Sequence, residues 1–178
     1  MSVDTALTTF DEALKTPLLG VDGAHHSLSS LRGEKGTVVV FVGNGCPTVR
    51  SYEDRLMRLQ ERYRPRGINV IAVNSNNPFL SPPDTVAELR KRARLRGFNF
   101  PYLKDAEGVV ARSFGAVCTP HAFLLDDEDN IAYRGRIDDS RVGDAITSHD
   151  LANAIDDLLG DRPVTVPIAE PFGCSIVW

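Results

Sequence analysis

The chain has 178 residues, of which 42% are hydrophobic and 25% are charged, and its formal net charge at pH 7 is −4. This profile is typical of a soluble globular domain with a hydrophobic core, and it gives no reason to expect a nucleic acid or an anionic membrane as partner. No stretch approaches the ~20 apolar residues of a membrane-spanning helix, and Met1 to Thr5 carry no basic segment of a signal peptide. We therefore expect one domain over residues 1–178 and, by default, a cytoplasmic protein.

The first half of the chain predicts two buried strands on either side of a long helix. A connector over residues 28–35 leads into the apolar run 38–42, which has the length of a buried strand. A helical pattern then opens with Pro47 and places apolar residues three or four positions apart up to Tyr63. The apolar run 68–73 predicts the second buried strand.

The second half predicts shorter elements. After the polar loop 74–83, Thr85 and Glu88 form a capping box for a helix that ends near Arg96 at Gly97. The remaining predicted elements are a short helix over 109–114, a hairpin of strands 122–125 and 131–133, a last helix that Ser148 caps and Gly160 ends, and an irregular proline-rich tail from about 163 to 178. This order of elements predicts an α/β sandwich with a mixed sheet.

Cys46 is the main candidate for chemistry, because it lies between a buried strand and a helix that opens with Pro47. The N-terminus of a helix offers unpaired N–H groups and the positive end of the helix dipole, which favour a thiolate. In such settings the pKa of a cysteine can fall from about 8.5 to roughly 3.5–7.5. The alternative is an inert cysteine that packs as a small apolar residue. The chain has three cysteines, an odd number that does not suggest a secreted disulfide framework.

Six short motifs follow one another along the chain. They are Asn44-Gly45-Cys46-Pro47, Val73-Asn74-Ser75-Asn76, Phe100-Pro101-Tyr102-Leu103, Cys118-Thr119-Pro120, Gly135-Arg136-Ile137-Asp138-Asp139 and Gly173-Cys174-Ser175-Ile176. In this order they resemble the peroxiredoxin-like branch of the redoxin (alkyl hydroperoxide reductase/thiol-specific antioxidant) family, from about Pro17 to the C-terminus. The resemblance implies a thioredoxin-like three-layer α/β/α sandwich with a central mixed sheet, and a thiol oxidoreductase of antioxidant type.

The resemblance also implies roles for single residues. Cys46 matches the first cysteine of the thioredoxin dithiol motif, but Val49 stands in the place of the second. Pro120 matches the cis-proline beside the active thiol, although an ordinary trans proline at the start of a strand is the alternative. Peroxiredoxins resemble one another in carrying Thr or Ser at the position of Gly43, and its absence here favours thiol–disulfide exchange over fast peroxide reduction.

The partner that resolves an intermediate on Cys46 stays open among three candidates. Cys118 lies two residues before Pro120, and either approaches Cys46 or is a buried small residue. Cys174 lies in the tail, whose apolar residues can dock on the body of the protein and either carry Cys174 to Cys46 or cover an edge. A disulfide requires the two Cα atoms to lie within about 7 Å. The third candidate is an external thiol.

Several other residues are expected to support the site. Arg50 and Arg136 are candidate cations for the thiol, with a solvated Arg50 and an Arg136 that pairs with Asp138 or Asp139 as the alternatives. The full set of supporting residues is Gly45, Pro47, Thr48, Asn74, Thr119 and Arg136.

Two classes of function remain. In the first, Cys46 is a nucleophile toward a small peroxide or a disulfide, with a thiol reductant or a partner protein completing the cycle. In the second, the fold is a redox-inactive binding module for a protein or for a soft metal, which Cys118 and His121 would bind together with Cys46. We favour the first class and expect no cofactor, no resident metal, no nucleic acid and no membrane as partner.

Overall fold

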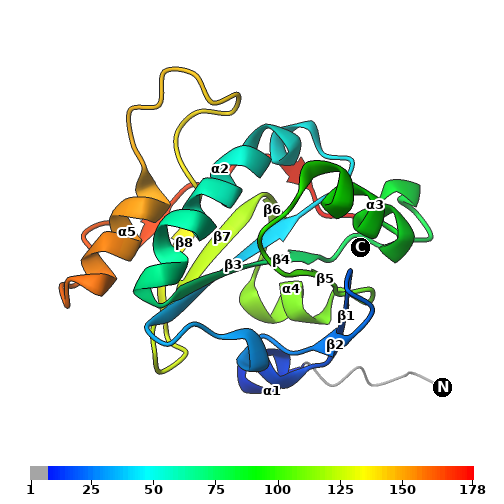
Figure 1. Ribbon diagram of the computed structural model, residues 1–178, viewed down its shortest axis with the longest axis horizontal. Coiled ribbons are helices and arrows are strands. Elements are labelled where there is room, and N and C mark those ends of the chain that lie inside the picture. The colour runs from blue at the N-terminus through cyan, green and yellow to red at the C-terminus, as the bar shows by residue number, and fades with distance from the viewer. Residues whose placement is uncertain (1–7) are drawn as a thin grey trace.

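A computed structural model describes residues 8–178 of the chain (Figure 1). Met1 to Thr5, on which the expectation of no signal peptide rests, lie outside the described residues. Among the described residues no helix has both the length and the apolar character that a membrane span requires.

The centre of the fold is a mixed sheet of eight strands in the order β2-β1-β5-β4-β3-β7-β8-β9. The two predicted buried strands are β3 and β4, which lie side by side and parallel over their whole length. On its other side β3 pairs antiparallel with β7, which forms the predicted hairpin with β8. The strands are β1 (Leu18–Gly20), β2 (His25–His26), β3 (Gly36–Val42), β4 (Ile68–Asn74), β5 (Tyr102–Lys104), β6 (Cys118–Thr119), β7 (His121–Leu125), β8 (Ile131–Gly135), β9 (Ile168–Ala169) and β10 (Cys174–Ser175).

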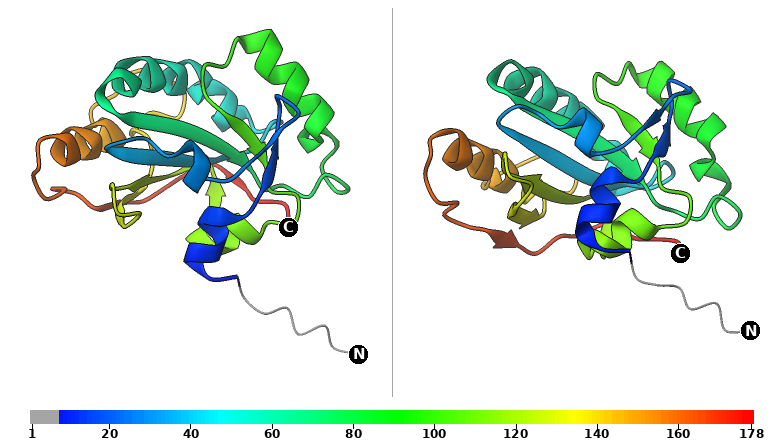
Figure 2. Two further views of the ribbon diagram at one scale, coloured as in Figure 1. Left: turned by 60° about the horizontal axis from the view of Figure 1, so that its bottom comes forward. Right: turned by 90° about the horizontal axis from the view of Figure 1, so that it is seen from below.

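Helices cover both faces of this sheet, as Figure 2 shows. The side chains of β3 alternate between two cores, with Val38 and Val40 in one core and Val39 and Phe41 in the other. Helices α2, α3 and α5 contribute to the first core, and α1 and α4 to the second. The predicted three-layer α/β/α sandwich is therefore confirmed. The helices are α1 (Phe10–Lys15), α2 (Pro47–Tyr63), α3 (Val86–Arg96), α4 (Val109–Phe114) and α5 (Asp150–Leu159), with single 3-10 turns η1 (Ser29–Leu31), η2 (Arg64–Arg66) and η3 (Pro82–Asp84).

The ends of the helices test the predicted caps. Thr85 is the N-cap of α3 and accepts a hydrogen bond from the Glu88 backbone N–H at 3.4 Å, and Gly97 ends that helix in the left-handed region with φ 67°. The cap predicted for α5 is wrong. His149 is the N-cap, and the Ser148 hydroxyl donates to the Asp150 side chain at 2.9 Å instead of accepting a backbone N–H of the helix.

The sequence did not predict the short elements α1, β1, β2, β5 and β6, or the two strands of the tail. Strands of two or three residues are too short to show a periodic pattern. In the tail, β9 pairs in parallel with β8, and β10 pairs antiparallel with β6 in a separate two-stranded sheet. The tail, red in Figure 2, runs from the α5 side of the molecule to the α4 side.

Candidate active site

Cys46 lies at the start of α2, where β3 has ended and the chain turns into the helix. It is the N-cap residue, and its Sγ accepts a hydrogen bond from the Val49 backbone N–H at 3.5 Å. Pro47 occupies the first turn, where a missing N–H costs nothing because that group would have no partner in the helix. Only 7% of Cys46 is exposed. The sulfur therefore accepts a hydrogen bond from the first turn of the helix and is largely shielded from water.

The loop before β7 closes over the same sulfur. The Thr119–Pro120 peptide bond is cis, as the resemblance implied. The Thr119 carbonyl oxygen lies 3.6 Å from Cys46 Sγ. Thr119 and Pro120, both predicted site residues, are thus brought to the cysteine.

Cys46 is joined to Cys174 by a disulfide at the N-terminal end of α2. The Cα atoms are 6.2 Å apart, although the two residues are separated by 128 positions in the sequence. This Cα separation falls in the usual disulfide range of about 4.4–6.8 Å. Of the partners that the sequence left open, the structure pairs Cys46 with Cys174.

Backbone pairing brings Cys174 to this position. In the β10–β6 ladder Cys174 stands opposite Thr119, and Ser175 stands opposite Cys118. Gly173 has φ 155°, and a Cβ at this position would collide with the Thr119 carbonyl oxygen. Only glycine therefore allows the tail to approach β6 this closely.

The end of the tail is anchored beyond Cys174. The Val177 backbone N–H donates to Asn76 Oδ1 at 2.8 Å, and the Asn77 N–H donates to the Val177 carbonyl at 2.6 Å. Ile176 is buried in the core on the α4 face of the sheet. The Trp178 ring lies 4.3 Å from the Arg112 guanidinium carbon.

Cys118 is a free, half-buried cysteine. Its neighbour in the ladder is Ser175, whereas Cys174 is opposite Thr119. Because successive residues of a strand point to opposite faces, the Cys118 side chain points away from the face that Cys174 shares with Thr119. Burial raises the pKa of the Cys118 thiol, with a smaller contribution from Glu170. The thiol form of Cys118 is thus favoured.

A buried polar network supports the loop that carries Cys46. The Asp84 carboxylate accepts hydrogen bonds from the Asn44 backbone N–H and the Asn74 side chain, both at 2.7 Å, and from Asn76 at 3.2 Å. The Ser81 hydroxyl donates to it as well. Burial alone would raise the pKa of Asp84, but these hydrogen bonds outweigh it and hold the pKa below its usual value. Asp84 therefore remains a carboxylate that fixes loop 43–46.

Lys104 completes this network from β5. Its ammonium group donates to Asn74 Oδ1 at 2.7 Å and to the Asn76 carbonyl at 2.5 Å. Burial lowers the pKa of Lys104 to about 8, against the opposing effect of Asp84 and Asp105. Asn74 was predicted to line the site, but it contacts Asp84 and Lys104 beneath the loop. The sequence reading missed these two partners, which come from a 3-10 turn and a three-residue strand.

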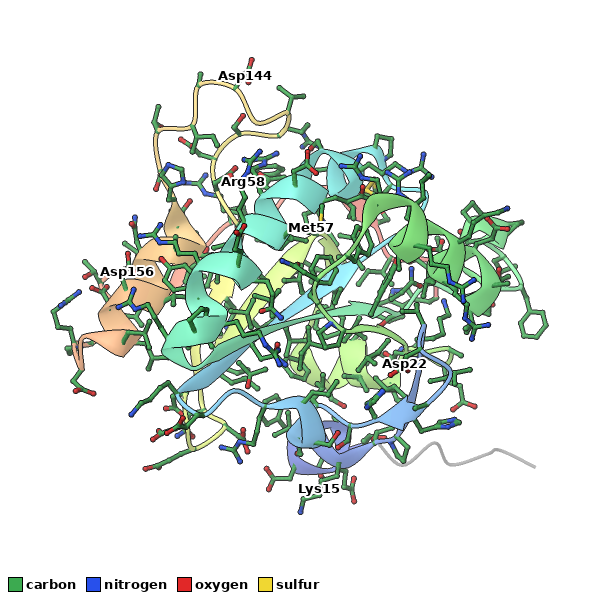
Figure 3. The ribbon with its side chains drawn as sticks, viewed as in Figure 1. Lys15, Asp22, Met57, Arg58, Asp144 and Asp156 are labelled. Atoms are coloured by element: carbon green, nitrogen blue, oxygen red, sulfur yellow. A yellow bond between two sulfur atoms is a disulfide. The ribbon has the colours of Figure 1, made fainter. Side chains whose placement is uncertain are left out.

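The remaining predicted residues lie around the cysteine in different roles. The buried Thr48 hydroxyl accepts from the Arg141 guanidinium at 3.2 Å, and Arg141 also lies over the Phe172 ring of the tail. Arg141 was not predicted, because it comes from the exposed loop between β8 and α5, whose Asp144 is labelled in Figure 3. Gly45 is exposed and lies beside Pro83.

The two candidate cations have other partners. The Arg50 Nε–H donates to the Asn44 carbonyl at 3.1 Å. The Arg136 Nε–H donates to the Asp150 carboxylate at 2.7 Å. The pairing of Arg136 with Asp138 or Asp139 is therefore wrong, because the start of α5 brings Asp150 to the end of β8.

Two of the three residues of the soft-metal alternative are engaged in other contacts. Cys46 is in the disulfide, and His121 Nδ1 accepts a hydrogen bond from the Val117 backbone N–H at 3.2 Å. Burial, with a smaller effect of Arg134, lowers the pKa of His121 to about 4. Among residues 8–178 no three His, Cys, Asp or Glu side chains form a group that could hold a metal ion.

Comparison with known proteins gives both close and distant relatives. The chain is 28% identical over 127 residues to the thiol-disulfide oxidoreductase ResA of Geobacillus kaustophilus, a match that covers 71% of this chain and 68% of that protein. The chain thus spans about two thirds of the length of this curated relative. It is 36% identical to an uncharacterized conserved protein from Geobacillus kaustophilus of known structure, with a TM-score of 0.85 over 92% of this chain and 89% of the other.

A more distant structure supports the fold. A putative thioredoxin from Neisseria meningitidis superposes with a TM-score of 0.64 at 23% identity, over 82% of this chain and 88% of the other. The model of the AhpC/TSA family matches residues 9–134, which include Cys46 and the cis-proline. By this match, which extends over more than half of its length, the chain belongs to the AhpC/TSA family.

Proposed function

We propose that the protein is a thiol–disulfide oxidoreductase in which Cys46 is the nucleophile and Cys174 is the resolving cysteine. The observation that carries this proposal is the Cys46–Cys174 disulfide, which joins the start of α2 to the C-terminal tail beside a cis-proline. The thiol-disulfide oxidoreductase activity named for the ResA relative supports it.

The proposed cycle begins with the reduced protein. The Cys46 thiolate attacks one sulfur of a substrate disulfide, forms a mixed disulfide, and releases the other substrate sulfur as a thiolate. The Cys174 thiolate then attacks Cys46 Sγ, closes the Cys46–Cys174 disulfide and releases the second substrate sulfur. The substrate disulfide gains two electrons and the cysteine pair loses two. A thiol reductant returns the pair to its reduced form by the reverse exchange.

The two cysteines differ in the way this division of roles requires. Cys46 lies at a helix N-terminus with a backbone N–H directed at its sulfur, a setting that stabilises a thiolate. Cys174 lies in a two-residue strand of the tail and has no such setting. Since Cys46 is largely covered in the oxidised protein, the tail has to move away before a substrate disulfide reaches it.

We also propose that this cycle operates in the cytoplasm on disulfides of small molecules or proteins. A reducing compartment supplies the thiol reductant and makes a reactive disulfide transient. An antioxidant role would follow if Cys46 also reduced peroxides, in which case it would pass through a sulfenic acid that Cys174 converts to the disulfide with loss of water.

The test is to react the reduced protein with oxidised glutathione and, separately, with hydrogen peroxide, and to map the modified cysteines by mass spectrometry. Oxidised glutathione should convert the wild-type chain to the Cys46–Cys174 disulfide, and should leave a glutathione adduct on Cys46 in Cys174→Ser. Cys118→Ser is the matched control and should behave as wild type.

Three results would contradict the proposal. Cys46 could react no faster than Cys118 with either oxidant, which would remove the redox function. Cys174 could form the adduct in Cys46→Ser as fast as Cys46 does in Cys174→Ser, which would reverse the roles. A reaction with peroxide far faster than with the disulfide would make the protein a peroxidase.

A further inference from the structure

The Thr119 hydroxyl is buried without a hydrogen-bond partner beside the disulfide. Thr119 is 2% exposed, and its Oγ1 is the one side-chain nitrogen or oxygen so buried and unpaired within residues 8–178. An unpaired buried hydroxyl is unfavourable, since it has lost its water and gained nothing in return. Such groups are rare in folded proteins and call for an explanation.

The surroundings of Gly43 show that this hydroxyl lies near Cys46. A Cβ placed on Gly43 would lie 2.9 Å from Asn76 Nδ2, 3.3 Å from Thr119 Oγ1 and 3.4 Å from the Cβ of Cys46. These three groups therefore lie around the position that a side chain at residue 43 would occupy, and they are too close together to leave room for one. The Thr119 backbone lies against the cysteine as well, with its carbonyl oxygen 3.6 Å from Cys46 Sγ.

Among the groups near the Thr119 hydroxyl, Cys46 Sγ is an acceptor whose strength changes with the redox state of the protein. Asn76 faces the same position with its amide nitrogen, which donates to Asp84 and is itself a donor. In the disulfide, Cys46 Sγ is neutral and bonded to Cys174, and is a weak acceptor. After reduction the same sulfur can carry a negative charge, and hydrogen bonds to charged acceptors are about twice as strong as those between neutral groups.

We infer that the Thr119 hydroxyl donates a hydrogen bond to the Cys46 thiolate of the reduced protein. This inference rests on the proposed function, because it requires Cys46 to cycle between disulfide and thiolate. The hydroxyl is unpaired in the oxidised protein and paired in the reduced one, so it favours the reduced protein. It also favours the thiolate over the thiol, because only the thiolate is a strong acceptor.

Two properties of Cys46 should therefore depend on the hydroxyl. Its loss should raise the pKa of Cys46 by about one unit, the size of one hydrogen bond to a charged group. It should also shift the equilibrium with glutathione about tenfold toward the Cys46–Cys174 disulfide, which corresponds to about 30 mV for this two-electron couple.

The test compares Thr119→Val, which keeps the shape and removes the hydroxyl, with Thr119→Ser, which keeps the hydroxyl. The pKa of Cys46 is read from the pH dependence of iodoacetamide alkylation of the full-length reduced chain, resolved by site with mass spectrometry. The disulfide equilibrium is read in glutathione buffers. We expect both shifts in Thr119→Val and values close to wild type in Thr119→Ser.

Stability provides a readout that a purely structural role would not reproduce. Thr119→Val should leave the oxidised protein at least as stable as wild type, since the buried hydroxyl has no partner there. It should destabilise the reduced protein at a pH where Cys46 is a thiolate. Equal destabilisation of both forms would overturn the inference and leave Thr119 a packing residue.

The failure of this inference is distinct from the failure of the proposed function. If wild-type Cys46 is reactive and closes the disulfide, but Thr119→Val changes neither its pKa nor its equilibrium, only the inference is wrong. Equal shifts in Thr119→Val and Thr119→Ser would also overturn it. If wild-type Cys46 is no more reactive than Cys118, the proposed function fails and the inference fails with it.

Discussion

The two cysteines of the disulfide lie in regions of very different construction. Cys46 stands between a strand buried at every position and a helix of 17 residues, above the network of Asp84 and Lys104. Cys174 is held by a two-residue strand and by a few contacts of the tail. Ordering a short segment through few contacts is easily reversed, because local opening costs least where burial is smallest. In the proposed function Cys46 is thus fixed in place, and Cys174 lies in the segment whose local opening costs less.

The largest expected effect on stability comes from disrupting the buried polar network beneath Cys46. In Asp84→Asn, an NH₂ group replaces one of the two carboxylate oxygens. In either orientation of the amide this NH₂ faces a donor, the Asn44 backbone N–H or the Asn76 side chain. The substitution also removes a buried negative charge near Lys104. We expect a loss of about 3 kcal/mol in the free energy of unfolding, since unpaired buried donors and charges cost this much. Urea denaturation of the oxidised protein measures it.

A surface carboxylate provides the matched control for this change. Asp54 pairs with Arg96 at 2.6 Å and is largely exposed, so Asp54→Asn should cost less than about 1 kcal/mol. Equal effects of the two substitutions would show that the network beneath Cys46 contributes no more than a surface ion pair.

Disrupting the pairing of β10 with β6 should leave the reactivity of Cys46 itself intact. Gly173→Ala places a Cβ against the Thr119 carbonyl and should prevent the close approach of β10 to β6. We expect closure of the Cys46–Cys174 disulfide to slow by about tenfold or more, because misplacement by about 1 Å can cost a hundredfold in a positioned reaction. Stopped-flow mixing with oxidised glutathione, followed by quenching and mass spectrometry, separates closure from formation of the adduct on Cys46.

Gly97→Ala controls for the backbone effect of the same substitution. Gly97 also has a positive φ, but a Cβ there meets nothing within 4 Å. This variant should lose about 1 kcal/mol of stability and close the disulfide at the wild-type rate. If Gly173→Ala closes equally fast, the β10–β6 pairing does not position Cys174.

The free energy of unfolding should depend on pH through His121, which is buried in β7 beside the cis-proline. Burial lowers the pKa of His121, next to the cis-proline, to about 4 in the folded protein, whereas an unfolded histidine titrates near 6.5. Between these values the unfolded chain binds more protons, so the contribution of neutral His121 is complete above about pH 6.5 and is lost as the pH falls toward 4. Urea titrations at pH 7, 6 and 5 measure it.

His121→Asn isolates this histidine from the other groups that titrate in acid. Asparagine keeps an acceptor for the Val117 N–H but does not titrate in this range. The stability advantage of the wild type over His121→Asn should therefore shrink from pH 7 to pH 5. A constant difference across this range would mean that His121 does not titrate with the lowered pKa.

The same contrast explains what the sequence could predict. The fixed side was predictable because β3, α2 and β4 show long apolar patterns, and because Thr85 and Gly97 punctuate α3. The place of Cys46 follows from those patterns. The cis-proline followed from the family resemblance, since no local signal distinguishes Pro120 from a trans proline.

The contacts between distant segments were not predictable. The pairing of Cys174 depends on the path of the tail and on Gly173, and neither leaves a periodic pattern in the sequence. Arg136 was assigned to acidic residues near it in sequence, but the fold brings Asp150 to it. Gly43 was correctly noted as lacking a hydroxyl, yet the hydroxyl of Thr119, 76 positions later, lies beside it in space.

The smallest expected effect concerns the end of the tail. Trp178→Ala removes the contact with the Arg112 guanidinium, which lies 4.3 Å from the ring, while β10 and its pairing stay in place. Because a cation–π contact at an exposed site contributes about 0.5–1 kcal/mol, disulfide closure should slow only two- to fivefold. The same quenched-flow measurement applies, and Arg112→Ala with the double variant completes a mutant cycle. If the two single effects add in the double variant, the ring and the guanidinium do not interact, and the end of the tail is held by β10, Ile176 and the hydrogen bonds of Val177.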